Sequence, residues 1–203
     1  MGIFTSSQQP PASNFMKPLP TLWTTDRLIV RDSILDEAER LCEIFNANSH
    51  IGLWDPTFQV IDTAEIERLI HMSNLREEPG HENFQMQSVF EHEAGQIIGY
   101  FHCYHGVAKD GVRHDDISFI SMFVLDSKWQ QHGYGGEIVD NLIDLSQGLG
   151  DRASLGVRVY LKNWPALRFW TQQNFRHIAR MDGDCEHGPE AHASFVLFNK
   201  LRG

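Results

Sequence analysis

Apolar and polar residues follow two different periods along this chain, and the two periods separate strands from helices. Alternating or continuously apolar runs predict strands at about residues 28–31, 84–91, 96–104, 116–125, 155–161, 175–181 and 192–199. Apolar stripes with helical spacing predict helices that begin near residues 38, 62, 135 and 163. The second helix starts at Asp62, where the run Asp-Thr-Ala-Glu resembles a capping box. This order predicts a mixed α/β (α+β) sheet with helices on both faces.

Length and composition are those of one globular domain. The chain has 203 residues, of which 41% are hydrophobic and 22% are charged. Residues 1–20 are rich in Ser, Gln and Pro, which predicts a flexible N-terminal arm, and residues 21–203 are expected to form the single domain. No apolar run reaches the length of a membrane-spanning helix, and the N-terminus lacks the pattern of a signal peptide, so no membrane partner is expected.

Charge and cysteine content narrow the partners and the compartment. A net charge of −10 argues against a broad basic face for nucleic acid and favours cationic partners such as amines. Cys42, Cys103 and Cys185 are far apart and odd in number, which predicts a reducing compartment, the cytoplasm.

The eleven histidines raise the question of a metal site. His102 and His105 lie three apart on a predicted strand, where they face opposite sides and chelate poorly. Cys185, His187 and His192 lie in or beside a loop but lack a convincing fourth ligand. No metal is therefore expected.

The strongest chemical signal is residues 123–136, Phe-Val-Leu-Asp-Ser-Lys-Trp-Gln-Gln-His-Gly-Tyr-Gly-Gly. An apolar strand passes through a polar turn into an amphipathic helix, and the glycines let several backbone N–H groups converge. Together with the positive end of the helix, these groups suit a phosphate or pyrophosphate. A glycine turn that only links strand to helix is the alternative interpretation. The segment lacks the Gly-Lys-Ser/Thr of a P-loop and the Gly-x-Gly-x-x-Gly of a dinucleotide site.

The same segment resembles motif A of the GNAT superfamily of N-acetyltransferases, Val-x-x-x-x-Arg/Gln-x-x-Gly-x-Gly/Ala. Leu125 falls on the Val, Gln130 on the Arg/Gln, and Gly133 and Gly135 on the two glycine positions. Residues 163–175, which begin Asn-Trp-Pro-Ala-Leu-Arg-Phe-Trp and end Asn-Phe, resemble motif B, Asn-x-x-Ala-x-x-Phe/Leu-Tyr-x-x-x-Gly-Phe. Residues 25–31 look like the opening strand of ribosomal-protein-type members, and the resemblance spans about residues 24–200.

This resemblance implies a GNAT-type, largely antiparallel sheet of six to seven strands, with about four helices and central strands that splay near Leu125 and Val159. It also implies acetyl-CoA as co-substrate. By analogy, the backbone of residues 123–125 pairs with the pantetheine arm, and the amides of residues 130–136 bind the pyrophosphate. The cofactor-binding residues that the resemblance implies are Phe123, Val124, Leu125, Gln130, Gln131, His132, Gly133, Tyr134, Gly135, Gly136, Asn163, Phe169 and Trp170.

The chain departs from the family at the catalytic positions. Trp170 stands where many members have a tyrosine that protonates the leaving thiolate, and an indole N–H has no accessible acidity. Trp170 either packs in the core or contacts the cofactor. Family bases often match Phe119 and Ser121, and neither of these is a base. The catalytic candidates are Ser121, Asp116 and His102, with His105, Glu91 or a water chain also open.

The paired motifs favour an acyltransferase that moves an acetyl group to a primary amine of a small molecule or a peptide N-terminus. The missing tyrosine and the missing strand base favour an alternative, a catalytically silent module that binds or senses acyl-CoA. Transfer of a longer acyl group is a third hypothesis, and the sequence is also compatible with a homodimer. Trp54 and Phe58 are candidates for lining the acceptor cleft.

Overall fold

The computed structural model describes residues 18–76, 83–106, 117–148, 154–186 and 188–199. Within these ranges eight strands form one sheet in the order β1-β2-β3-β4-β5-β6-β8-β7. The strands are β1 (Leu22–Thr24), β2 (Leu28–Asp32), β3 (Phe84–Glu91), β4 (Ile97–His105), β5 (Ile117–Leu125), β6 (Ser154–Tyr160), β7 (Phe175–Gly183) and β8 (Ala193–Asn199). The α-helices are α1 (Ala38–Ala47), α2 (Thr63–Asn74), α3 (Tyr134–Gly148) and α4 (Trp164–Gln172).

The sheet has one strand more than the upper number expected from the sequence. The additional strand is β1, which pairs with β2 through only three residues. A run of three residues is too short to show an alternating pattern. Trp23 in this strand is nevertheless buried, and its indole nitrogen donates to Oε1 of Gln87 at 2.9 Å. The seven other strands lie close to their predicted positions.

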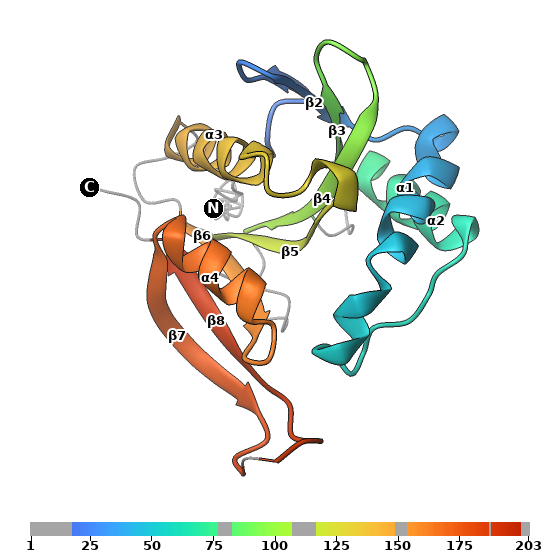
Figure 1. Ribbon diagram of the computed structural model, residues 1–203. Coiled ribbons are helices and arrows are strands. Elements are labelled where there is room, and N and C mark those ends of the chain that lie inside the picture. The colour runs from blue at the N-terminus through green and yellow to red at the C-terminus, as the bar shows by residue number, and fades with distance from the viewer. Residues whose placement is uncertain (1–17, 77–82, 107–116, 149–153, 187, 200–203) are drawn as a thin grey trace, which may run out of the picture.

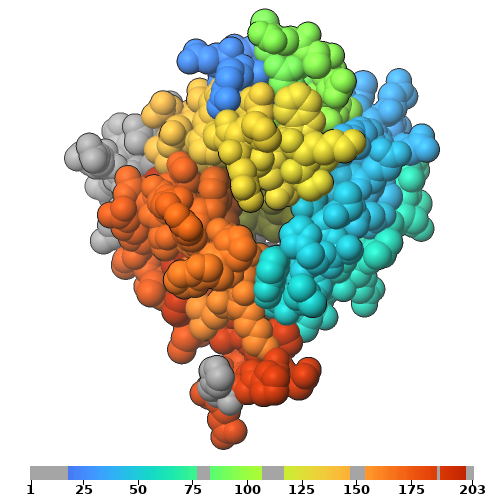
Figure 2. Space-filling view, viewed as in Figure 1, coloured from blue at the N-terminus to red at the C-terminus, as the bar shows by residue number. Residues whose placement is uncertain are grey.

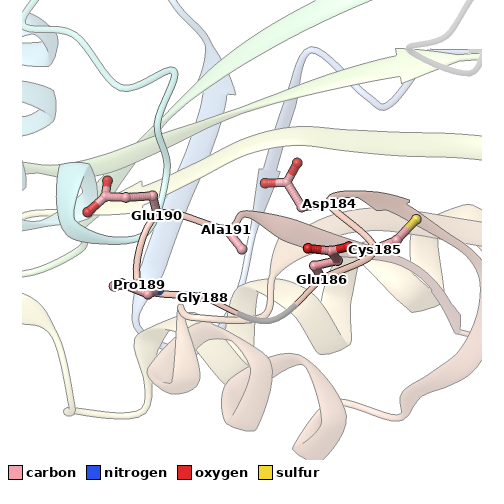
Figure 3. Close-up of a pocket in the computed structure, with 7 residues that line it drawn as sticks. All are labelled: Asp184, Cys185, Glu186, Gly188, Pro189, Glu190 and Ala191. Carbon is pink, nitrogen blue, oxygen red and sulfur yellow. The ribbon is translucent and has the colours of Figure 1, made fainter.

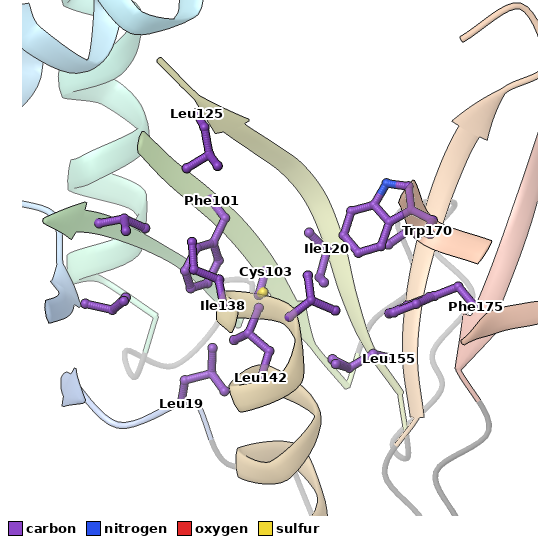
Figure 4. Close-up of a cluster of buried hydrophobic side chains, with 14 of the residues drawn as sticks. Leu19, Phe101, Cys103, Ile120, Leu125, Ile138, Leu142, Leu155, Trp170 and Phe175 are labelled. Carbon is purple, nitrogen blue, oxygen red and sulfur yellow. The ribbon is translucent and has the colours of Figure 1, made fainter. Parts of the chain in front are cut away.

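Helices cover both faces of the sheet, as expected (Figure 1). On one face, α3 contributes Ile138, Val139 and Leu142 and α4 contributes Trp170 to a large apolar cluster (Figure 4). On the other face, α1 and α2 pack a second cluster against β3 and β4. Two predicted helix starts are confirmed: Oδ1 of Asp62 accepts from the Glu65 amide at 3.0 Å, and Oδ1 of Asn163 accepts from the Ala166 amide at 3.1 Å.

Neighbouring strands run antiparallel except for β5 and β6, which are parallel in the described sheet. Residues Ile117–Ile120 pair with Ser154–Val157. Beyond Ile120 and Val157 the two strands no longer pair with each other. β5 still pairs with β4, and β6 still pairs with β8. The sheet therefore splits between the ends of β5 and β6. This is the splaying that the resemblance implied.

A network of polar side chains holds the end of the N-terminal segment on the sheet. Residues 1–17 of the predicted arm lie outside the described residues, but the backbone amide of Leu19 donates to Oε1 of Gln85 at 2.9 Å. Nε2 of Gln85 donates to Asp32 at 2.7 Å. His105, also bonded to Gln85, is fully buried, and burial lowers its pKa to about 3. His105 is therefore neutral and enclosed, which makes it a poor general base.

Candidate functional site

The split in the sheet leaves the last part of β5 without a neighbour on its β6 side. Figure 2 shows that the surface is hollowed at this place, where the yellow segment at the start of α3, the orange segment of α4 and the cyan segment around residue 50 meet. The cyan segment includes the short 3-10 helix η2 (Ser49–Leu53), between α1 and α2. The colour of β5 is visible at the floor of this hollow. The hollow is the candidate cleft for a donor and an acceptor.

Ser121 is a β-bulge on the floor strand. Cys103 pairs with Ile120 and His102 pairs with Met122, so Ser121 is left without an opposite residue on β4. Its hydroxyl is buried and has no hydrogen-bond partner within the described chain. A buried hydroxyl without a partner is uncommon and commonly marks a position that a ligand or water completes. Ser121 thus keeps its place among the candidate residues as a hydrogen-bond donor.

The turn before α3 brings several backbone amides together. Gln131 and Gly133 have φ values of 63° and 84°, so both residues adopt a left-handed backbone conformation just before the helix begins at Tyr134. Within the described residues, none of the amides from Gln131 to Gly136 pairs with a backbone acceptor. Unpaired amides at a helix N-terminus are the geometry that binds phosphate groups. The expected pyrophosphate-binding turn therefore has the backbone it needs.

The two glycines at the start of α3 also permit close packing. A Cβ atom on Gly135 would lie 3.2 Å from the ring of Phe169, and one on Gly136 would lie 3.2 Å from Nε2 of Gln173. Phe169 in turn packs on Phe123 of β5, with ring centroids 6.0 Å apart. The start of α3 thus approaches α4 and β5 closely. The two glycines have a packing role here, and this role is compatible with a turn that binds a ligand.

Arg27 supplies a positive charge that the turn itself lacks. Its guanidinium lies 4.3 Å from the ring centroid of Tyr134 and donates to the His132 carbonyl at 3.0 Å. It also forms an ion pair with Glu137, with 2.6 Å between Nη2 and Oε2. The turn contains Gln130-Gln131-His132 and no arginine, and only Lys128 just before it carries a full positive charge. Arg27 comes from a segment more than one hundred residues away, and the sequence carries no signal that links the two.

The Arg27→Gln variant is expected to bind coenzyme A about three- to tenfold more weakly, because the turn loses the guanidinium that holds the His132 carbonyl and Glu137, together with its positive charge. Isothermal titration calorimetry measures the affinity. Arg31→Gln is the matched control, since Arg31 pairs with Glu37 in another part of the sheet. Equal affinities for wild type and Arg27→Gln would contradict this role.

Gln130 and Leu125 have structural partners of their own. Nε2 of Gln130 donates to the Leu125 carbonyl at 2.8 Å and to Oδ1 of Asn48 at 3.0 Å. Nδ2 of Asn48 donates to the same carbonyl at 3.2 Å. Because this carbonyl already accepts twice, pairing of β5 with an added strand falls to Phe123 and Val124. The Gln130 side chain fixes the turn, and only its backbone is left for a ligand.

Trp170 packs in the large apolar cluster. It is 7% exposed, and its ring centroid lies 4.9 Å from that of Phe175 and 5.0 Å from that of Phe169. Figure 4 shows its indole nitrogen pointing away from Phe175. These contacts favour the packing interpretation of Trp170 and show why a large aromatic residue stands here.

The other catalytic candidates are not brought together. His102 is buried on β4 and stacks on Tyr100 at 5.4 Å, with Phe84 at 5.3 Å. Glu91 lies at the end of β3, where backbone amides of Ala94 and Glu93 lower its pKa, and it belongs to the β3–β4 turn. Asp116 lies outside the described residues. The general base thus has no assignment among these side chains.

Asp55 and Tyr160 border the hollow, and sequence reasoning missed both. Tyr160, the last residue of β6, lies near Asp55 and Thr57, which follow η2. Burial, and then the charge of Asp55, raise the pKa of Tyr160. The carbonyl of Trp54 also approaches Nδ1 of His192 at 3.3 Å. Trp54 is half-buried, and whether its ring lines the acceptor cleft stays a prediction.

A second concavity lies at the tip of the β7–β8 hairpin, lined by Asp184, Cys185, Glu186, Gly188, Pro189, Glu190 and Ala191 (Figure 3). These residues belong to one loop, which joins β7 to β8. Among the residues that the structure describes, no group of three His, Cys, Asp or Glu side chains is placed to hold a metal. No described helix is long and apolar enough to cross a membrane.

A mixed sheet that splits beside the unpaired amides of a helix N-terminus has the geometry to hold a phosphate-bearing ligand in the split. The chain matches the model of the acetyltransferase (GNAT) family over residues 48–175, and it belongs to this family. No curated protein matches it in sequence.

Solved structures with the same fold include RimL, named as a ribosomal L7/L12 alpha-N-protein acetyltransferase in complex with coenzyme A. It has 13% identity and a TM-score of 0.68 over 90% of this chain and 97% of that chain. Ribosomal-protein-S5-alanine acetyltransferase from Vibrio fischeri has 14% identity and a TM-score of 0.66, covering 90% and 97%. The protein yncA from Salmonella typhimurium, with its cofactor acetyl-CoA, has 13% identity and a TM-score of 0.63, covering 87% and 95%. At these identities the likeness concerns the fold.

Proposed function

We propose that this protein transfers the acetyl group of acetyl-CoA to a primary amine of a small molecule or a peptide N-terminus. The observation that carries the proposal is the split between β5 and β6, which opens beside the unpaired amides of residues 131–136. Such a split gives a thioester and an amine a common place to meet. The family membership supports the acetyl group, and the names of several fold relatives support an amine at a protein N-terminus.

The residues present fit coenzyme A. The amides of Gln131 to Gly136 would bind the pyrophosphate, with Arg27 as the neighbouring cation. The free edge of β5 at Phe123 and Val124 would pair with the pantetheine arm. Oδ1 of Asn163 caps α4, which leaves its amide nitrogen for the same ligand. When bound, the co-substrate supplies an acyl group activated as a thioester.

The chain's own residues would act mainly by positioning. A neutral amine attacks the thioester carbonyl, the C–N bond forms, and the C–S bond breaks with release of the thiolate. The proton that the nitrogen loses passes to the thiolate, directly or through water, which gives the amide and the coenzyme A thiol. The bulge at Ser121 places a backbone turn and a buried hydroxyl on the floor strand, where a developing oxyanion needs donors. Trp170 packs on Phe123 of this strand, with ring centroids 5.9 Å apart, and would support the floor of the cleft from the core. A coenzyme A thiol leaves readily, so turnover does not require the tyrosine that Trp170 replaces.

The test is turnover of acetyl-CoA over a panel of amines that includes aliphatic monoamines, diamines, amino acid amides and peptides. We expect thiol release that depends on both the protein and an amine, with the acetylated amine confirmed by mass spectrometry. Wild-type protein that fails to bind coenzyme A in calorimetry would refute the proposal.

One set of observations favours the second candidate, a silent acyl-CoA-binding module. His102 stacks in the core and Trp170 is buried, so neither of these two side chains offers a general base or acid to the cleft. A silent module would bind acetyl-CoA and gain thermal stability from it, yet release no thiol with any amine of the panel. Turnover with one amine excludes it.

The remaining proposals concern the bounds of the domain and its cellular compartment. We take residues 21–203 as the acyltransferase domain and the cytoplasm as its compartment. All three cysteines are unpaired, and burial raises the pKa of the Cys103 thiol, which suits a structural residue in a reducing environment.

A further inference from the structure

The side of the cleft opposite α3 and α4 carries a second polar site, formed by Asp55, Thr57 and Tyr160. Successive residues of a strand face opposite sides of the sheet. Leu155, Val157 and Val159 of β6 belong to the cluster under α3 and α4, so Tyr160 faces the side of α1 and α2. Tyr160 also lies beyond Val157, the last residue of β6 that pairs with β5. It therefore borders the split on the acceptor side.

Asp55 is held in place by hydrogen bonds from neutral groups. Its Oδ1 accepts from the backbone amide of Thr57 at 2.8 Å and from the Thr57 hydroxyl at 2.6 Å. The Tyr160 side chain lies near enough to this carboxylate for the Asp55 charge to raise the pKa of Tyr160. The Asp55 amide donates to the Ile51 carbonyl at 2.9 Å, which anchors the backbone to η2. The carboxylate is thus preorganised and half-buried at the border of the cleft.

No cation of the described chain forms an ion pair with this carboxylate. The described ion pairs include no Lys, Arg or His partner for Asp55. Arg158, on the same face of β6 as Tyr160, forms an ion pair with Asp182 at 2.9 Å. A carboxylate that loses part of its hydration on binding a ligand gains from an opposite charge on that ligand. A cation brought by a ligand would complete the site.

We infer that Asp55, oriented by Thr57 and Tyr160, binds a positive charge on the acceptor, next to the amine that receives the acetyl group. The inference rests on the proposed function and narrows its substrate class to acceptors with a second cationic group, such as diamines. The reacting amine itself must be neutral to attack, so the carboxylate serves a second ammonium group. Asp55 is then a residue that determines specificity.

The test compares wild type with Asp55→Asn on matched pairs of acceptors: putrescine against n-butylamine, and lysine amide against norleucine amide. Each pair differs by one positive charge. Wild type is expected to prefer the dicationic member by about tenfold in kcat/KM, the size of one charge-assisted hydrogen bond. Asp55→Asn keeps an oxygen acceptor for Thr57 and Tyr160, and it should lose the preference through KM while kcat changes little.

Two further variants separate binding from folding. Tyr160→Phe removes the hydroxyl that orients Asp55 and should reduce the preference by a smaller factor, about threefold. Asp36→Asn removes an equal charge from an exposed site on the 3-10 helix before α1 and should leave the preference unchanged. The melting temperature and coenzyme A affinity of each variant establish that the protein is folded and binds its donor.

The inference fails if wild type acetylates both members of each pair equally, or if Asp55→Asn retains the preference. These outcomes leave the proposed function standing, because they require turnover. Failure of the proposed function is seen earlier, as wild-type protein that does not bind coenzyme A or acetylates no amine, and it removes the inference with it.

Discussion

The Gly133→Val variant is expected to bind coenzyme A at least about tenfold more weakly than wild type. Gly133 has a φ of 84°, and a left-handed conformation costs an L-residue about 1–2 kcal/mol, more when it is β-branched. The turn would relax toward an ordinary φ, and the amides from Gln131 to Gly136 would no longer converge. A loss of about 1.4 kcal/mol corresponds to the tenfold change in affinity. Isothermal titration calorimetry with coenzyme A measures it.

The matched control is Gly188→Val. A Cβ on Gly188 would meet no atom within 4 Å, and its φ lies outside the left-handed region, so the substitution should leave both affinity and folding unchanged. Circular dichroism and thermal unfolding confirm that Gly133→Val is folded. Wild-type affinity in a folded Gly133→Val protein would contradict the phosphate-binding role of this turn.

The Trp170→Ala variant is expected to lose about 3–5 kcal/mol of unfolding free energy. Trp170 is 7% exposed and contacts three aromatic rings, those of Phe123, Phe169 and Phe175. Its removal would leave a cavity between β5, α4 and β7 that these rings cannot easily fill. Urea denaturation gives the difference in free energy directly.

Trp164→Ala is the control, because Trp164 is 67% exposed at the start of the same helix. Its unfolding free energy should change by no more than about 0.5 kcal/mol. A loss below about 1 kcal/mol for Trp170→Ala would show that Trp170 does not support the core, and would favour the contact with the cofactor instead.

Local patterns predicted most of the fold. The strands and helices have periodic apolar positions, and caps such as Asp62 and Asn163 act on amides three residues away, so short windows of sequence contain the needed information. The strand β1 was missed because its three residues gain their order from a partner, the side chain of Gln87, which lies far along the chain.

The candidate site also has one part that the sequence predicted and another part that it did not. The glycine turn and the strand before it are contiguous and were found from their spacing. Arg27 and Glu137 are 110 residues apart, and Asp55 meets Tyr160 only because η2 and β6 border the same hollow. Such pairs follow from the path of the chain through the sheet. A sequence without its fold gives no reason to connect them.

The parallel pairing of β5 and β6 has an electrostatic consequence. Both strands run in the same direction, so the turns that follow them lie at the same end of the strands. α3 and α4 both begin at this end (Figure 1). Each helix presents the equivalent of about half a positive charge at its N-terminus. Two such ends would create a local positive field in a chain whose net charge is −10. An anionic donor would thus be attracted to the N-termini of these two helices, while the acidic remainder of the surface attracts amines.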